Sequence, residues 1–249
     1  FMSLKNGMGE LANALAGSIA PIAHVDTPVE GLDPLPDCGF RLAFSDRTSI
    51  IARQVVLAIP AAPAAQLLQP FARIAASGIA DLRTVGAASI TLAYPTRIIP
   101  RPLPGYGLLA PATSHAPFNA ITVSSAKFPE RAPAGWTLLR IFFGGFRSPE
   151  SMLLDDDELL QSIRAELHPI MGIDADPAFH RITRWPSGSP QYDVGHRERI
   201  DTVDAALPPG LVVTGSAFRG VGLPDIVHDA TRVAATLQEP SSQLLAERS

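Results

Sequence analysis

The sequence predicts an α+β fold with α/β blocks at both ends and a strand-rich block between them. Three observations indicate this order. A short apolar strand, a glycine turn and a helix follow one another over residues 213–237. Helical and extended segments alternate over residues 4–68, and most of the segments between residues 85 and 185 have the pattern of strands. One α/β domain interrupted by a second, sheet-rich domain accounts for this order.

The first block begins with a helix. Leu11, Leu15 and Ile19 recur four residues apart on one face, which predicts a helix over residues 4–22. Ser45 and Asp46 favour a hairpin turn over residues 45–48. The other elements predicted in this block are extended segments at 24–32, 39–44 and 50–59 and a helix at 61–68.

The middle and last blocks contain the remaining elements. The acidic residues at 155–158 suit a helix N-terminus, whose dipole favours negative charge, and they predict a helix over 155–171. The tail from residue 238 is polar. The sequence also predicts strands at 85–94, 120–125, 137–143, 179–185 and 210–214 and helices at 196–206 and 222–237.

Composition narrows the class of protein. Of the 249 residues, 46% are hydrophobic and 18% are charged, which is typical of a well-buried globular chain. The net charge of −4 and the lack of a basic block exclude a nucleic-acid partner. Apolar runs fall short of the roughly 20 residues that a membrane helix needs. The single cysteine, Cys38, cannot form an internal disulfide and is interpreted as a turn residue, so we expect a cytoplasmic, reducing location.

The glycine turn is the clearest candidate site. Gly215, Gly220 and Gly222 lie between the strand and the last helix, where glycine permits positive φ or close approach of a ligand. The start of that helix offers N–H groups to an anion, although a plain structural turn in which Asp225 caps the helix explains the pattern equally well. No G-x-G-x-x-G follows a strand, so the chain lacks a nucleotide fingerprint of its own.

Other candidates point to structural roles. The histidines at 24, 115, 168, 180, 196 and 228 show no metal-ligand spacing, so no metal site is predicted. His196 is expected to position a turn rather than to act as a base. The sequence names no catalytic acid or base, and the catalytic residues stay unknown.

Five stretches in order resemble one family. The turn segment 213–225 resembles the C-terminal flavin-binding segment of amine oxidase-type flavoproteins. Residues 3–11 are similar to the S-L-x-G-G-M-x-x-L segment of protoporphyrinogen oxidases, with Asn6 where that family usually has glycine. The other three stretches resemble the S-S-x-x-F-P-x-R-A-P, G-G and P-Q-Y-x-x-G-H motifs of the same family. They are 123–133 (VSSAKFPERAP), 139–147 (LRIFFGGFR) and 189–196 (SPQYDVGH).

The resemblance implies an FAD/NAD(P)-binding-like fold and an oxygen-dependent, FAD-dependent oxidation of protoporphyrinogen IX to protoporphyrin IX. Its partners would be the porphyrinogen and molecular oxygen; peripheral membrane contact is left open, as is the oligomeric state. The family's N-terminal glycine fingerprint has no counterpart here, so the chain is interpreted as a C-terminal portion. We expect an FAD-binding part at 1–71 and 193–238, a substrate-binding domain at 72–192 and a tail at 239–249.

The resemblance also implies site residues. The positions that match its cofactor segment are Val29, Gly215, Gly220, Val221, Gly222 and Leu223. The positions that match its substrate pocket are Tyr106, Leu109 and Phe142, whose apolar side chains suit a flat macrocycle. Arg197 stands where some members have an aromatic residue.

Several alternatives stay open. Carboxylates of the substrate need cations, and the arginines near the pocket segments are Arg97, Arg101, Arg140 and Arg147, each of which could instead be structural. The runner-up reaction is oxidation of coproporphyrinogen III to coproporphyrin III, followed by that of another amine oxidase or phytoene desaturase-type flavoenzyme. A truncated, inactive chain is the alternative outside enzymes.

Overall fold

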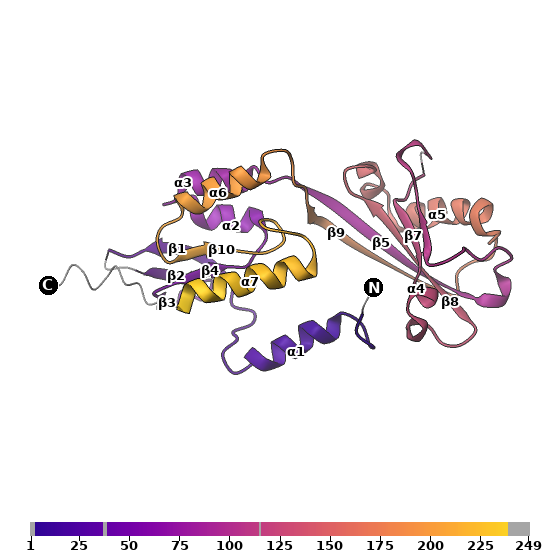
Figure 1. Ribbon diagram of the computed structural model, residues 1–249, viewed down its shortest axis with the longest axis horizontal. Coiled ribbons are helices and arrows are strands. Elements are labelled where there is room, and N and C mark those ends of the chain that lie inside the picture. The colour runs from indigo at the N-terminus through magenta and orange to yellow at the C-terminus, as the bar shows by residue number, and fades with distance from the viewer. Residues whose placement is uncertain (1–2, 37–38, 115, 239–249) are drawn as a thin grey trace. The chain divides into compact units, whose positions relative to one another are not determined.

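The chain forms two compact units, which are described separately here from a computed structural model. One unit comprises residues 1–23 and 84–189, and the other comprises residues 24–83 and 190–249. The structure describes residues 3–36, 39–114 and 116–238 (Figure 1). Of the sequence-based predictions, those on Cys38, His115 and the tail at 239–249 lie outside the described residues.

The unit formed by residues 24–83 and 190–249 contains the α/β part. Strand β10 (Leu211–Val213) pairs in parallel with β4 (Val55–Leu57), and the helices α2 (Ala61–Leu68), α3 (Arg73–Ala80) and α6 (His196–Ala206) pack against this pair. Alanines at the contacts let α2 and α3 approach each other closely. Figure 1 shows these helices along one side of the pair and α7 (Leu223–Gln238) along the other.

A small antiparallel sheet completes this unit. Its strands β1 (Val29–Pro34), β2 (Phe40–Phe44) and β3 (Ser49–Ala52) follow in sequence order. The predicted hairpin turn is confirmed, because Asp46 accepts hydrogen bonds from the backbone and hydroxyl of Thr48 at 2.9 and 2.6 Å. Strand β1 lies at an edge of this sheet.

The other unit is built on a five-stranded sheet. Its strands are β5 (Thr84–Pro95), β6 (Gly107–Leu109), β7 (Ala120–Val123), β8 (Trp136–Gly144) and β9 (Phe179–Pro190), in the order β6-β7-β8-β5-β9. The pairs β6–β7, β7–β8 and β5–β8 are antiparallel. Alternate residues of each strand therefore lie on opposite faces of the sheet.

Helix α5 (Asp156–Met171) covers one face of that sheet. Its buried residues Leu159, Ile163, Leu167 and Met171 recur every four residues and join the core formed by Ile90, Leu92, Leu139 and Ile141. A capping box of Asp155 and Glu158 begins the helix, and Gly172, with φ of 70°, ends it. The predicted helix at 155–171 is confirmed, and its acidic start proves to be this cap.

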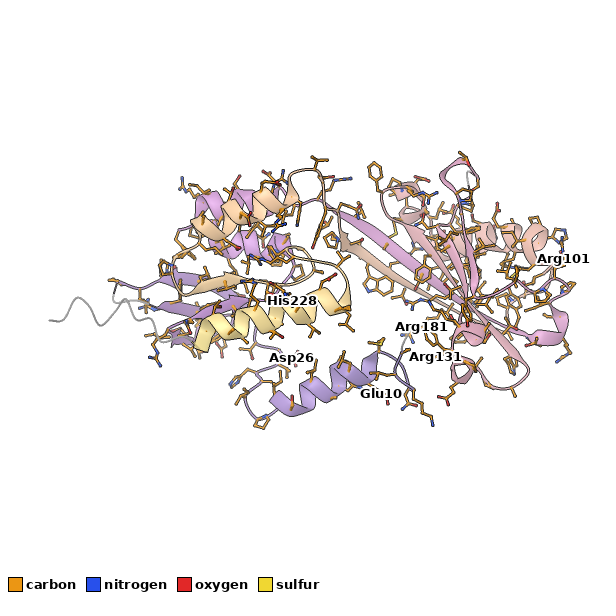
Figure 2. All side chains as sticks on the ribbon, in the orientation of Figure 1. Glu10, Asp26, Arg101, Arg131, Arg181 and His228 are labelled. Atoms are coloured by element: carbon orange, nitrogen blue, oxygen red, sulfur yellow. The ribbon has the colours of Figure 1, made fainter. Side chains whose placement is uncertain are left out.

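Arg131 ties the N-terminal segment to the same unit. Its guanidinium donates to the hydroxyl of Ser3 at 2.7 Å and to the carbonyl of Leu4 at 2.9 Å, beside the start of α1 (Gly9–Ile19) (Figure 2). The helix predicted over 4–22 is shorter in the structure. Gly7 takes a φ of 108°, which interrupts helical geometry before Gly9.

Three further predictions differ from the structure. The extended segment at 50–59 divides into β3 and β4, which belong to different sheets. Residues 124–127 form the short helix α4 (Ser124–Lys127) where a strand end was expected. Helix α3 was not predicted, because its buried face consists of Ala75, Ala76 and Ile79, which carry little hydrophobic contrast.

Candidate functional site

The glycine turn begins directly after the buried strand β10. Gly215 and Gly220 have φ of 120° and 131°, in the region that side chains disfavour. A Cβ on Gly215 would meet no atom within 4 Å, so the backbone borders open space at that point. Gly215 is thus required by its φ, and it leaves one side of the turn free for a ligand.

Asp225 fills the other part of the turn. A Cβ on Gly220 would lie 2.4 Å from the Cβ of Asp225, and one on Gly222 would lie 2.8 Å from its carboxylate Oδ2. Asp225 lies in the first turn of α7, where negative charge suits the helix dipole. These two glycines therefore make room for the protein's own aspartate, which agrees with the structural explanation of the turn at these positions.

Tyr192 holds the two ends of the turn together. Its hydroxyl donates to the carbonyl of Ser216 and accepts from the N–H of Gly220, each at 2.7 Å. Its ring stacks on His196, with 3.7 Å between centroids and 11° between planes. Burial raises the pKa of Tyr192, outweighing the opposite effect of the Gly220 hydrogen bond, so the phenol stays protonated and can donate.

His196 also contacts the turn. Its Nε2 lies 2.9 Å from the carbonyl oxygen of Phe218 and therefore donates to it. This contact agrees with the positioning role expected from the sequence. The role of Tyr192 was missed, although it lies in the same S-P-Q-Y-D-V-G-H stretch, which was the available signal.

A buried acidic residue anchors the turn to α7. Asp229, only 4% exposed, accepts from the Thr214 hydroxyl at 2.5 Å and from Arg232 at 2.8 Å. Burial acts to raise the pKa of Asp229, but the hydrogen bonds from Thr214 and Arg232 outweigh it and the pKa is lowered. Arg219 donates to the carbonyl of Val213 at 3.1 Å and pairs with Asp204. The two aspartates and two arginines beneath the turn thus neutralise one another.

The residues predicted to bind the cofactor all belong to this unit. Val221 and Leu223 expose apolar side chains where α7 begins, with 60% and 44% of their surface accessible. Val29 begins the edge strand β1 and pairs with Phe44 across an irregularity in the register. Since β1 is an edge strand, its outer backbone groups are not paired with another strand among the described residues.

The predicted substrate residues belong to the five-stranded sheet. The register pairs Leu109 with Ala120, Ala120 with Phe142, and Phe142 with Ser89. Leu109 and Phe142 therefore lie in one row on the face opposite α5, here called the open face. Tyr106 is exposed just before β6, and its carbonyl accepts from the N–H of Val123 at 2.8 Å.

The next row of the open face is polar. It joins Thr122, Arg140 and Thr91 by the same register. The Cζ of Arg140 lies 5.1 Å from the centroid of the Phe142 ring, within the range of a cation–π contact. The face thus places a cation directly beside an aromatic ring.

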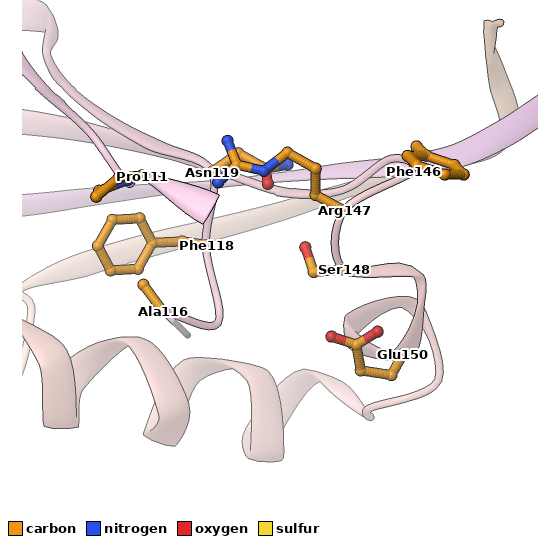
Figure 3. A pocket seen from close by; sticks show the side chains of 8 residues that line it. All are labelled: Pro111, Ala116, Phe118, Asn119, Phe146, Arg147, Ser148 and Glu150. Carbon is orange, nitrogen blue, oxygen red and sulfur yellow. The ribbon is translucent and has the colours of Figure 1, made fainter. Parts of the chain in front are cut away.

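A separate pocket lies beyond the ends of β7 and β8 (Figure 3). It has a volume of about 360 Å³, and within it Arg147 donates to the carbonyl of Ala110 at 2.9 Å. Asn119 donates to the carbonyl of Gly144 at 2.8 Å. The lining residues are Pro111, Ala116, Phe118, Asn119, Phe146, Arg147, Ser148 and Glu150.

The remaining candidate arginines are Arg101 and Arg97. Arg101 donates to the carbonyl of His168 at the end of α5, and Arg97 is exposed in a short 3-10 helix.

Within the described part of the chain, no three His, Cys, Asp or Glu side chains are grouped so that they could hold a metal ion. No described helix is long and apolar enough to cross a membrane.

The comparison with protein families identifies the chain. Residues 2–238 match the profile described as flavin containing amine oxidoreductase. The chain belongs to this family. The match confirms the resemblance found in the sequence and indicates FAD as the cofactor.

The curated relatives that the chain resembles are porphyrinogen oxidases of two kinds. The chain is 35% identical to a coproporphyrinogen III oxidase of Propionibacterium freudenreichii over 94% of this chain and 44% of that one. It is 28% identical to a coproporphyrinogen III oxidase of Bacillus subtilis, over 91% of this chain and 48% of that one. It is 25% identical to a chloroplastic protoporphyrinogen oxidase of Nicotiana tabacum, covering 94% and 45%. The chain spans about half the length of these relatives.

Solved structures confirm the α+β fold. One from Exiguobacterium sp. 255-15 carries a provisional assignment as a protoporphyrinogen oxidase and matches with a TM-score of 0.80 and 27% identity, covering 94% of this chain and 51% of that one. A putrescine oxidase bound to putrescine matches with a TM-score of 0.75 and 15% identity, covering 93% and 53%. The second likeness concerns the fold alone.

Proposed function

We propose that this chain supplies the substrate face and part of the flavin site of an FAD-dependent porphyrinogen oxidase. The observation that carries the proposal is the register that places Leu109 and Phe142 in one row of the open face, in a chain of this flavoprotein family. A flat macrocycle gains most of its binding free energy from contact area. The exposed Leu109 and the half-buried Phe142 offer such area.

The substrate is proposed from the relatives. Sequence analysis placed protoporphyrinogen IX first, whereas the more similar named relatives are coproporphyrinogen III oxidases, at 35% against 25% identity. We therefore favour coproporphyrinogen III as the substrate and retain protoporphyrinogen IX as the second candidate. The two differ in their rim groups, since the first carries four propionates and the second carries two propionates and two vinyl groups.

The glycine turn fits a flavin. Gly215 borders open space, the exposed Val221 and Leu223 offer apolar contact, and β1, which begins at Val29, has no strand paired with its outer edge among the described residues. Tyr192 and Asp225 would hold the turn in shape, and N–H groups at the start of α7 would favour negative charge. When bound, FAD would supply the electron acceptor for the oxidation, with oxygen as the final acceptor.

The protein's own part would be binding and orientation. Leu109 and Phe142 would support the ring, and no described residue is assigned as a catalytic acid or base. The predicted division into a flavin-binding part at 1–71 and 193–238 and a substrate-binding part at 72–192 stays a proposal, as does the cytoplasmic location. The compact units themselves divide between residues 23 and 24, 83 and 84, and 189 and 190. Since the chain spans about half of each relative, an inactive isolated chain is the competing hypothesis.

Aerobic turnover tests the proposal. The 249-residue chain, and the product of the whole reading frame in which it occurs, are each given FAD and then coproporphyrinogen III or protoporphyrinogen IX. We expect porphyrin fluorescence above the protein-free rate, faster with coproporphyrinogen III. Lack of bound flavin and of porphyrin formation with both proteins would refute the function, and activity of the longer product alone would support the inactive isolated chain.

A further inference from the structure

The proposed substrate face contains one arginine whose placement distinguishes it from the other three candidates. Leu139, Ile141 and Phe143 on β8 point into the core under α5, so the alternating residues Arg140 and Phe142 lie on the open face. Arg140 pairs by register with Thr122 on β7 and Thr91 on β5. A polar row with one cation therefore runs beside the apolar row of Leu109 and Phe142.

The other arginines near the pocket segments lie elsewhere. Arg101 is held at the C-terminal end of α5, where Figure 2 shows it at the margin of its unit. Arg147 is turned toward the carbonyl of Ala110 in the separate pocket. Arg97 is exposed in the 3-10 helix that follows β5. Of these four candidate arginines, Arg140 is the one that the register places on the face of Leu109 and Phe142.

The guanidinium of Arg140 is positioned but not neutralised by the described residues. Its Cζ lies 5.1 Å from the centroid of the Phe142 ring, and its Nη2 lies 3.5 Å from the hydroxyl of the buried Ser89. Among the residues that the structure describes, Arg140 forms no ion pair, whereas Arg219, Arg184 and Arg232 each pair with an aspartate. A positioned cation without a counter-charge is suited to an anionic ligand.

We propose that Arg140 binds a propionate carboxylate on the rim of the tetrapyrrole. The inference rests on the proposed function and adds the recognition group to it. Arginine donates two parallel N–H bonds to a carboxylate, which a point charge such as lysine cannot reproduce. Phe142 would contact the ring while Arg140, two residues away on the same strand face, contacts its acidic rim.

Binding of the product measures this directly. Coproporphyrin III and its tetramethyl ester, which has the same ring and no charge, are titrated against the chain and against the product of its whole reading frame by porphyrin fluorescence. Arg140→Gln is expected to weaken binding of the acid about ten-fold to a hundred-fold and to leave binding of the ester unchanged. The affinity of Arg140→Lys for the acid should lie between the affinities of wild type and Arg140→Gln.

Controls separate the possible outcomes. Arg101→Gln removes an arginine from the end of α5 and should change neither affinity, and thermal unfolding checks that each variant is folded. Equal affinity of wild type and Arg140→Gln for the acid, or an equal loss for acid and ester, would overturn the inference while leaving the proposed function intact. If neither wild-type protein binds acid or ester, the inference and the proposed substrate fall together.

Discussion

The glycine turn and the open face of the sheet are built in different ways. Side chains fix the turn, because Tyr192, His196 and Asp225 contact its backbone from outside it. Backbone pairing fixes the face, and its side chains Leu109 and Arg140 remain exposed. Substitutions in the turn should therefore act through the stability of the fold, whereas those on the open face should act through binding of the ligand.

The largest expected effect contrasts the two faces of the sheet. Leu139 is fully buried under α5, whereas Leu109 is 82% exposed on the open face. Leu139→Ala should lower the free energy of unfolding by about 2–5 kcal/mol, and Leu109→Ala should change it by no more than about 0.5 kcal/mol. Denaturant unfolding measures both, and a comparable loss in the two variants would show that the open face is part of the core.

The second prediction compares two glycine substitutions in the turn. Gly220→Ala would face both a disfavoured φ and a clash with Asp225, costing roughly 1–3 kcal/mol for the backbone and about as much again for the overlap. Gly215→Ala is the matched control, since it has a similar φ and no neighbour within 4 Å. Equal destabilisation of the two variants by denaturant would contradict the packing role of Asp225.

The pH dependence tests the anchor beneath the turn. The pKa of Asp229 is lower in the folded chain than its unfolded value of about 3.9. Its contribution is therefore complete above that unfolded value and is lost as the pH falls through the folded one. Asp229→Asn should lower the free energy of unfolding by about 1.5–3 kcal/mol at pH 7, and its difference from wild type should shrink below about pH 4.

A carboxylate at the surface serves as the control for this comparison. Asp204 is more exposed and pairs with Arg219, so Asp204→Asn should cost only about 0–1 kcal/mol. Chemical unfolding at pH 7 and at pH 3.5 distinguishes the two. A constant difference between Asp229→Asn and wild type across this range would refute the assigned role of the carboxylate.

The smallest expected effect concerns the Tyr192 hydroxyl. Tyr192→Phe should keep the stacking on His196, lose the bonds to Ser216 and Gly220, and cost about 0.5–1.5 kcal/mol. Amide exchange of residues 215–222 should accelerate. Tyr94→Phe is the control, because the buried Tyr94 hydroxyl has no hydrogen-bond partner among the described residues, and it should leave this exchange unchanged.

Much of the fold could be predicted from local patterns. The helices at Ala61–Leu68 and His196–Ala206 have the bounds expected from the sequence, because their composition and flanking residues act locally. The division of residues 50–59 into two sheets could not be predicted, since it depends on the parallel partner Leu211–Val213, far along the chain. Tertiary pairing overrides local propensity there.

The candidate site was predictable in part. The order of motifs indicated the family, and the glycines of the turn stood out. The alternation Leu139, Arg140, Ile141, Phe142 already indicated that Arg140 and Phe142 share a face, but the choice between Arg140 and Arg147 needed the sheet register. Two features of the turn could not be predicted: Asp225 packs against Gly220, and the Tyr192 hydroxyl bridges Ser216 and Gly220. Both depend on contacts across the turn, which no local sequence pattern encodes.

The central claim is that the turn at residues 215–223 contacts the flavin. Hydrogen–deuterium exchange of the protein purified with its flavin, compared with the same protein after flavin removal, tests it most directly. We predict that bound flavin slows exchange in residues 215–223 and leaves exchange in β8, the central strand of the five-stranded sheet, unchanged. Flavin binding that leaves exchange in residues 215–223 unaltered would contradict it.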